Sequence, residues 1–163
     1  MRSKEKDKKG SDKNSLLVIW LTIFICIPLA FYISNLYHFK IFATTTLNIG
    51  LAIIILGIFL RLIIIKSLGI FFTVDVTIKQ NHTLRKDGFY KYLRHPSYFA
   101  SLISFIGFGI SLNNWISLSI IVIATFCAFL YRIRVEEKAL IAYFGIEYLV
   151  YKKSTKTIIP FIY

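Results

Sequence analysis

Residues 94–98 read Arg-His-Pro-Ser-Tyr, and residues 136–137 read Glu-Glu. Between these polar groups lie two apolar runs, at about 96–112 and 115–131, which are joined by a short polar turn at 111–114. Proline suits the first position of a helix, where its missing N–H costs nothing, so a helix is expected to begin at Pro96. Two such helices return both polar groups to one face of a membrane. The pattern therefore predicts a membrane hairpin with a polar pocket at its mouth.

Two further apolar runs precede this hairpin, at about 16–36 and at about 46–65, the latter interrupted only by Arg61. The chain has 163 residues, 56% of them apolar, and a mean hydropathy of +0.66. A transmembrane helix needs about 20 apolar residues, with roughly 17 as a lower limit. We therefore expect an all-α integral membrane protein with about four spans, of which the last two are short.

The remaining segments are polar or mixed. Residues 1–14 are Lys-rich without apolar periodicity and are predicted to be a disordered tail. Residues 135–151 place Leu140, Tyr143, Phe144 and Tyr148 at helical spacing, which predicts an interfacial amphipathic helix that Gly145 is able to break. We therefore expect one membrane domain over 15–163, with a catalytic core over about 69–162.

Basic residues outnumber acidic ones by 20 to 8, which gives a formal charge of +12. Six Lys/Arg precede the first run, six lie between the second and third runs, and six follow the fourth. The loop after the first run holds only Lys40. This is the positive-inside pattern of a multi-pass protein with both termini cytoplasmic. The excess charge orients the chain and attracts anionic membrane lipids, and its distribution argues against a nucleic-acid partner.

Cysteine usage gives no indication of a metal site. Cys26 and Cys127 fall inside apolar runs and are interpreted as buried small hydrophobes, and no Cys/His cluster has metal-ligand spacing. We therefore expect no metal. The first run is too long for a signal peptide and lacks a small-residue cleavage site, so it is interpreted as a span.

Helix geometry brings candidate reactive groups together. At about 1.5 Å per residue, the hairpin returns Glu136 to the level of His95. Arg132 and Glu136 are four residues apart and share a helix face. The positive end of the helix that starts at Pro96 favours an anionic group nearby. On residue types alone, a functional pocket and an ordinary ion pair worth about 0–1 kcal/mol both stay open.

Three separated blocks resemble motifs of one enzyme family. The stretch 88–98, Gly-Phe-Tyr-Lys-Tyr-Leu-Arg-His-Pro-Ser-Tyr, resembles the central motif of the isoprenylcysteine carboxyl methyltransferase family. The stretches 132–140 and 144–153, and the closing residues 160–162, resemble its later motifs. The blocks occur in the family's order and approximate spacing, and the resemblance covers about 69–162. Ala100 departs from a glycine that is frequent in the family, which puts close helix packing there in question.

The resemblance implies an integral membrane methyltransferase that uses S-adenosyl-L-methionine without the glycine-rich fingerprint of dinucleotide-type folds. It implies Arg132 as the residue that orients the substrate. Arg94 is expected to support Arg132 or to have a structural role. It implies a lipophilic substrate that enters from the bilayer. The residues assigned to the cofactor site are His82, Thr83, Leu84, Arg85, Tyr90, His95, Pro96, Ser97, Tyr98, Glu136 and Glu137.

These residue types suit the chemistry of that cofactor. Glu136 is able to bind its ammonium by a charge-assisted hydrogen bond. His95, tyrosine hydroxyls or backbone N–H groups are able to hold its carboxylate. Tyr90 and Tyr98 are expected to pack against the adenine or the sulfonium, unless they belong to an interfacial aromatic belt.

Other functions stay open at this point. Phospholipid amine N-methyltransferases look similar around Arg-His-Pro and the paired glutamates, although the block at 144–153 favours the carboxyl side. A carboxylate nucleophile needs no general base, whereas an amine needs a proton acceptor such as His95. An NADPH-dependent membrane reductase and a non-enzymatic adaptor are weaker alternatives. The identity of the methyl acceptor is not readable from the chain.

Overall fold

A computed structural model describes residues 2–42, 46–69 and 83–160. Within these ranges the chain is helical, and its only β-type pairing is an isolated parallel bridge between Leu93 and Lys156. The expectation of an all-α membrane protein is confirmed. The elements are α1 (Arg2–Leu36), α2 (Leu47–Leu68), the 3-10 helix η2 (Gly88–Lys91), α3 (Pro96–Ser111), α4 (Trp115–Phe144) and α5 (Ile146–Ser154).

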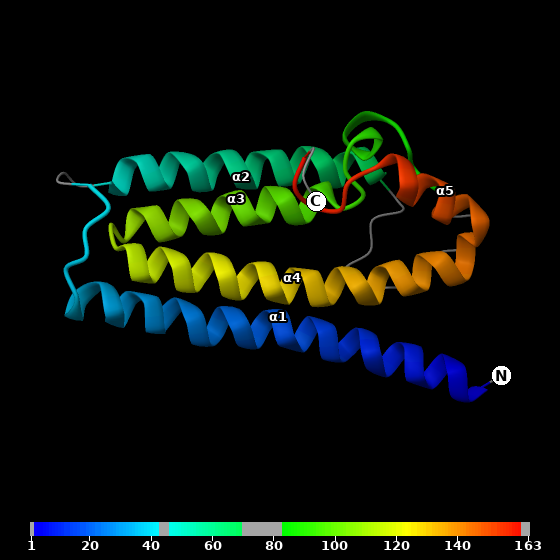
Figure 1. Cartoon of the computed structure of the whole chain (residues 1–163), viewed down its shortest axis with the longest axis horizontal. Coiled ribbons are helices and arrows are strands. Elements are labelled where there is room, and N and C mark those ends of the chain that lie inside the picture. Colours follow the sequence, from blue (N-terminus) through cyan, green and yellow to red (C-terminus); the bar gives the residue numbers. More distant parts are fainter. Residues whose placement is uncertain (1, 43–45, 70–82, 161–163) are drawn as a thin grey trace.

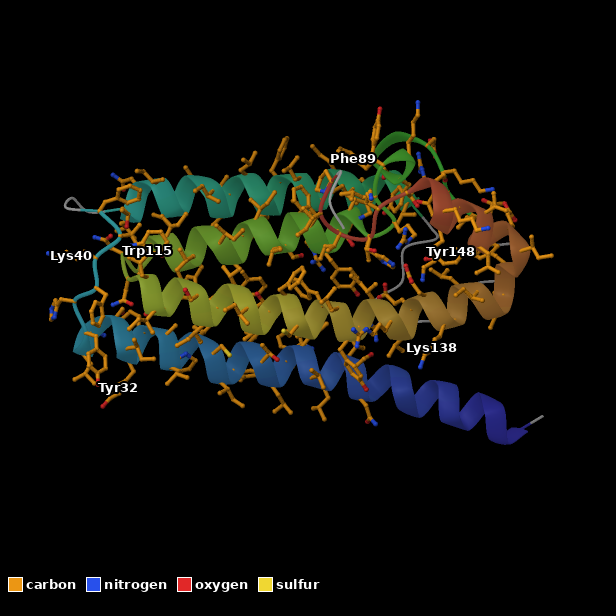
Figure 2. All side chains as sticks on the ribbon, in the orientation of Figure 1. Tyr32, Lys40, Phe89, Trp115, Lys138 and Tyr148 are labelled. Atoms are coloured by element: carbon orange, nitrogen blue, oxygen red, sulfur yellow. The ribbon has the colours of Figure 1, made fainter. Side chains whose placement is uncertain are left out.

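The four long helices lie in a row rather than in a closed bundle (Figure 1). α2 packs on α3, α3 on α4, and α4 on α1. Neighbours along the chain alternate in direction, so the end of α2 and the start of α3 lie at the same end of the row as α5. Figure 2 shows Lys138 and Tyr148 at this end and Lys40 and Trp115 at the opposite end.

Small residues let α2 and α3 approach closely. A Cβ built on Gly107 would lie 2.8 Å from the carbonyl oxygen of Gly50, and one built on Gly57 would lie 2.8 Å from that of Ala100. Backbone approach through small residues is a common way for membrane helices to associate. Ala100 is itself fully buried, so close packing persists at the position where the family often has glycine.

Two asparagines tie the far end of the row together. Asn114 caps α4 by accepting hydrogen bonds from the N–H groups of Ile116 and Ser117, each at 3.0 Å. Asn113, in the left-handed region at φ 48°, accepts from the N–H of Phe42 at 3.0 Å. The turn predicted at 111–114 is confirmed, and it also anchors the loop that follows α1.

α4 is longer than the predicted fourth span. It runs 30 residues, or roughly 45 Å, which exceeds the roughly 30 Å of a bilayer core. The separate helix predicted at 135–151 is wrong in its boundaries, because good helix formers such as Arg, Glu and Lys carry α4 through to Phe144. The break falls at Gly145, whose φ of +57° favours glycine, and α5 follows.

Among the described residues, three helices are long and apolar enough to cross a membrane: α1 from Asn14, α2 and α4. α3 is apolar but only 16 residues long. α1 begins at Arg2, within the segment for which a disordered tail is predicted. Cys127, which was expected to be buried, is exposed.

Candidate functional site

Residues 92–95 are paired through backbone hydrogen bonds with the segment that follows α5. The N–H of Lys156 donates to the carbonyl oxygen of Tyr92 at 3.0 Å, and the N–H of Arg94 donates to that of Lys156 at 2.9 Å. The N–H of His95 donates to the carbonyl oxygen of Thr157 at 3.1 Å. Ile158 then enters the core as a fully buried residue. This pairing fixes the backbone from which the Arg94 and His95 side chains project.

Arg94 clamps this segment to α4. Its Nε donates to Glu137 Oε1 at 2.7 Å, and its NH2 group donates to Thr157 Oγ1 at 2.8 Å. Its NH1 group donates to the carbonyl oxygens of Lys152 at 3.1 Å and Thr155 at 2.5 Å. With four hydrogen bonds to protein atoms, Arg94 is better suited to a positioning role than to substrate contact.

Glu136 is the centre of a second polar group, between α3 and α4. Its Oε1 accepts hydrogen bonds from the Tyr98 hydroxyl at 2.5 Å and from Arg132 Nε at 3.1 Å. Its Oε2 lies 3.4 Å from His95 Nδ1. Tyr98 also packs its ring on Phe129, with centroids 5.2 Å apart. The shared face predicted for Arg132 and Glu136, and the common level of His95 and Glu136, are both found.

His95 joins the two polar groups. Its Nδ1 faces Glu136, and its Nε2 lies 3.6 Å from Glu137 Oε1, which is longer than a hydrogen bond. Burial lowers the pKa of His95, but the two facing carboxylates outweigh burial and raise this pKa above its usual value. The imidazolium is therefore favoured between the two glutamates.

Two buried polar atoms have no hydrogen-bond partner among the described residues: His95 Nε2 and the Tyr148 hydroxyl. Tyr148 is 1% exposed, and burial raises the pKa of its hydroxyl well above its usual range. Buried polar groups are almost always paired, so two orphans beside one cluster point to a polar ligand or water there.

Arg132 is the most deeply buried member of the cluster, at 1% exposed. Besides Glu136, its NH1 group donates to the hydroxyl of Ser15 on α1 at 2.7 Å. Direct contact with an acceptor therefore requires that the acceptor replace part of this bonding. By contrast, the Glu136 side chain is 22% exposed, so it is more accessible to a ligand than Arg132 or His95.

The other residues assigned from the sequence fall into three groups. Tyr90 packs with Ile64 and Ala100 in a core cluster, and its carbonyl oxygen accepts from the Tyr151 hydroxyl at 2.6 Å. Pro96 is buried at the first turn of α3, as expected. The remaining members are more peripheral or not described. Thr83 is exposed, Leu84 and Ser97 are half-buried, Arg85 pairs with exposed Asp87 at 2.9 Å, and His82 lies outside the described residues.

Four residues of the network were not found by sequence reasoning: Ser15, Lys152, Thr155 and Thr157. Lys152 Nζ binds Glu137 Oε2 at 2.5 Å, and Thr155 and Thr157 are buried while Lys156 between them is exposed. This two-residue alternation, among β-branched side chains, is typical of an extended segment and was available in the sequence. Ser15 has no such local pattern, because its partner lies 117 positions away.

Known proteins share this architecture. The family model described as the isoprenylcysteine carboxyl methyltransferase family matches residues 49–142. Protein-S-isoprenylcysteine O-methyltransferase of Saccharomyces cerevisiae is 37% identical over 141 residues, which are 84% of this chain and 59% of the yeast protein. Protein-S-isoprenylcysteine O-methyltransferase A of Arabidopsis thaliana is 34% identical over 117 residues, which are 71% of this chain and 59% of the plant protein.

A solved structure of a methyltransferase of this family is also similar to this chain. The structure of the eukaryotic intramembrane Ras methyltransferase ICMT is 29% identical and superimposes with a TM-score of 0.63, covering 94% of this chain and 52% of that one. The chain thus spans somewhat more than half the length of the relatives that it matches. Its family match covers more than half of its own residues and includes the hairpin that carries His95, Arg132 and Glu136. The chain belongs to the isoprenylcysteine carboxyl methyltransferase family.

Proposed function

We propose that this protein transfers a methyl group from S-adenosyl-L-methionine to a carboxylate on a lipophilic acceptor, of the isoprenylcysteine type. The observation that carries the proposal is the Glu136 cluster, in which a partly exposed carboxylate lies beside a buried arginine at one end of a membrane helix row. Family membership supports the same reaction class. The charge pattern of the sequence supports placing this end, and both termini, on the cytoplasmic side.

The residues present fit such a cofactor. Glu136 offers a carboxylate for the cofactor ammonium. His95 Nε2 and the Tyr148 hydroxyl, which have no hydrogen-bond partner in the part of the chain that the structure describes, offer hydrogen bonds for its carboxylate. The cofactor itself supplies a methyl group on a sulfonium, which is already a good leaving group. The protein's main task is then to hold the two reactants in line.

Arg132 is the proposed partner of the acceptor. A carboxylate is nucleophilic without losing a proton, so no general base is required, and a guanidinium is able to orient its two oxygens. Arg94 supports the site indirectly, because it fixes Glu137 and the backbone before His95. An acceptor with a hydrocarbon tail would keep that tail in the bilayer while its carboxylate reaches the polar end of the row.

A methyl-transfer assay with a radiolabelled cofactor tests the proposal. Purified protein in nanodiscs is offered a prenylcysteine analogue in one arm and native membrane lipids in the other. We expect label in the prenylcysteine arm. Alkali should release this label as methanol, because methyl esters are alkali-labile. No transfer to either acceptor would contradict the proposal.

Methylation of a phospholipid amine is the alternative that one observation favours. An amine nucleophile must lose a proton, and the partly exposed carboxylate of Glu136 is able to accept one. Alkali-stable label in the lipid arm alone would support this alternative. It would remove the need for Arg132 to face a carboxylate.

A further inference from the structure

We propose that Ser15 of α1 is a positioning residue for Arg132, so that α1 forms part of the active site. The inference rests on the proposed function, because it assigns Ser15 to the reaction through the arginine proposed to orient the acceptor. Ser15 lies outside residues 49–142, which the family model matches.

The contact is fully buried. Ser15 is 0% exposed and Arg132 is 1% exposed, and the serine hydroxyl accepts a hydrogen bond from Arg132 NH1 at 2.7 Å. A buried guanidinium is costly unless its donors are hydrogen-bonded. Hydrogen bonds that involve a charged group contribute about 1.5–3 kcal/mol, more than most neutral ones.

Two bonds on different nitrogens fix the plane of the guanidinium. Nε binds Glu136 within α4, and NH1 binds Ser15 on the neighbouring helix. A guanidinium is rigid and planar, so holding two of its nitrogens sets the direction in which the rest of the group points. Without Ser15, Arg132 keeps its tie to Glu136 but loses this constraint from α1.

A second buried serine in the same helix pair provides a matched control. The Ser117 hydroxyl, also 0% exposed, donates to the carbonyl oxygen of Ala30 at 2.7 Å. Ser117 lies 15 residues before Arg132 on α4, or about 22 Å along the helix. Its bond joins α1 to α4 without touching the polar cluster.

The experiment compares Ser15→Ala, Ser15→Thr and Ser117→Ala with the wild-type protein in nanodiscs. Steady-state methyl transfer gives kcat and KM for the prenylcysteine analogue, and calorimetry gives the affinity for S-adenosylhomocysteine. We expect Ser15→Ala to lower kcat/KM for the acceptor about ten- to a hundredfold, which is 1.5–3 kcal/mol expressed as a ratio. Affinity for S-adenosylhomocysteine should stay within about twofold, Ser15→Thr should restore most activity, and Ser117→Ala should leave kcat/KM unchanged.

The outcomes separate this inference from the proposed function. An active wild-type protein with an unchanged Ser15→Ala variant would overturn the inference and leave the function standing. Equal losses in Ser15→Ala and Ser117→Ala, or a parallel loss of S-adenosylhomocysteine affinity, would show that the serine only docks α1 and would also overturn it. An inactive wild-type protein would overturn the function and the inference together.

Discussion

Arg94 and Glu137 form an ion pair in which Nε lies 2.7 Å from Oε1 and the two side chains are 7% and 11% exposed. The pair joins the segment before α3 to the C-terminal part of α4. Because Arg94 also binds three groups in and after α5, one side chain holds three segments together. Glu136 is the neighbour of Glu137 in the sequence, so its position depends on this clamp.

Replacing Arg94 with Met should therefore destabilise the fold strongly. Removing one partner of a buried ion pair costs about 3–5 kcal/mol, because the remaining charge is left uncompensated. The free energy of unfolding, measured by denaturation in mixed detergent micelles, should fall by that amount.

Lys86→Met is the matched control. Lys86 pairs with Glu147 at 2.7 Å, but both side chains are about half exposed, and such pairs contribute about 0–1 kcal/mol. Similar losses in both variants would show that Arg94 does not act as a clamp.

His95 should make stability depend on pH. Its pKa is raised in the folded protein by the facing carboxylates of Glu136 and Glu137, despite burial, which acts in the opposite direction. A raised pKa stabilises the fold fully below the unfolded value of about 6.5, and this contribution is lost as the pH rises through the folded pKa. The melting temperature in detergent should fall as the pH rises above about 6.5, and His95→Gln should flatten that fall. If the melting temperature of His95→Gln falls with pH as steeply as that of the wild type, groups other than His95 cause the pH dependence.

Much of the candidate site could be predicted because its central contacts are local or follow from helix geometry. Arg132 and Glu136 are one helical turn apart, and the hairpin length brings His95 within 3.4 Å of Glu136. The positive end of α3 likewise follows from Pro96 alone. These relations depend only on the rise of a helix and on short turns.

The other features of the candidate site and of the fold depend on tertiary contacts, which no local sequence pattern encodes. Whether Arg94 faces a substrate or a carbonyl oxygen is decided by the segment after α5, some 60 positions away. A tyrosine side chain suits a contact with the cofactor, but in the structure Tyr90 packs against Ile64 and Ala100 in a core cluster. Helix length was also misjudged, because the charged residues after position 131 are helix formers as well as membrane-boundary residues.

The α2–α3 contact should be intolerant of larger side chains. A Cβ on Gly57 would lie 2.7 Å from the backbone nitrogen of Ser104, and backbone cannot move aside as a side chain tip can. Gly57→Val should therefore lower the free energy of unfolding in mixed micelles by at least about 1–3 kcal/mol. Ala52→Val, on an exposed position of the same helix, should have little effect. A stable Gly57→Val variant would mean that α2 and α3 are less closely packed than the structure indicates.

Glu136→Gln should weaken cofactor binding while keeping the shape of the site. The amide is nearly isosteric with the carboxylate, and its oxygen is still able to accept from Tyr98 and Arg132. The amide lacks the negative charge with which we propose that Glu136 binds the cofactor ammonium. Loss of a hydrogen bond between charged groups costs about 1.5–3 kcal/mol, so the Kd for S-adenosylhomocysteine, measured by calorimetry, should rise about ten- to a hundredfold.

The control for this variant is Glu147→Gln, which removes the same charge from an exposed position on α5 that pairs with Lys86. Its S-adenosylhomocysteine affinity should match that of the wild type. Ligand-induced thermal stabilisation gives a second readout, because a ligand that binds only the folded protein raises its melting temperature, and at a fixed concentration a tighter ligand raises it more. Full affinity in Glu136→Gln by both measurements would remove Glu136 from the cofactor site and leave it as a partner that orients Arg132.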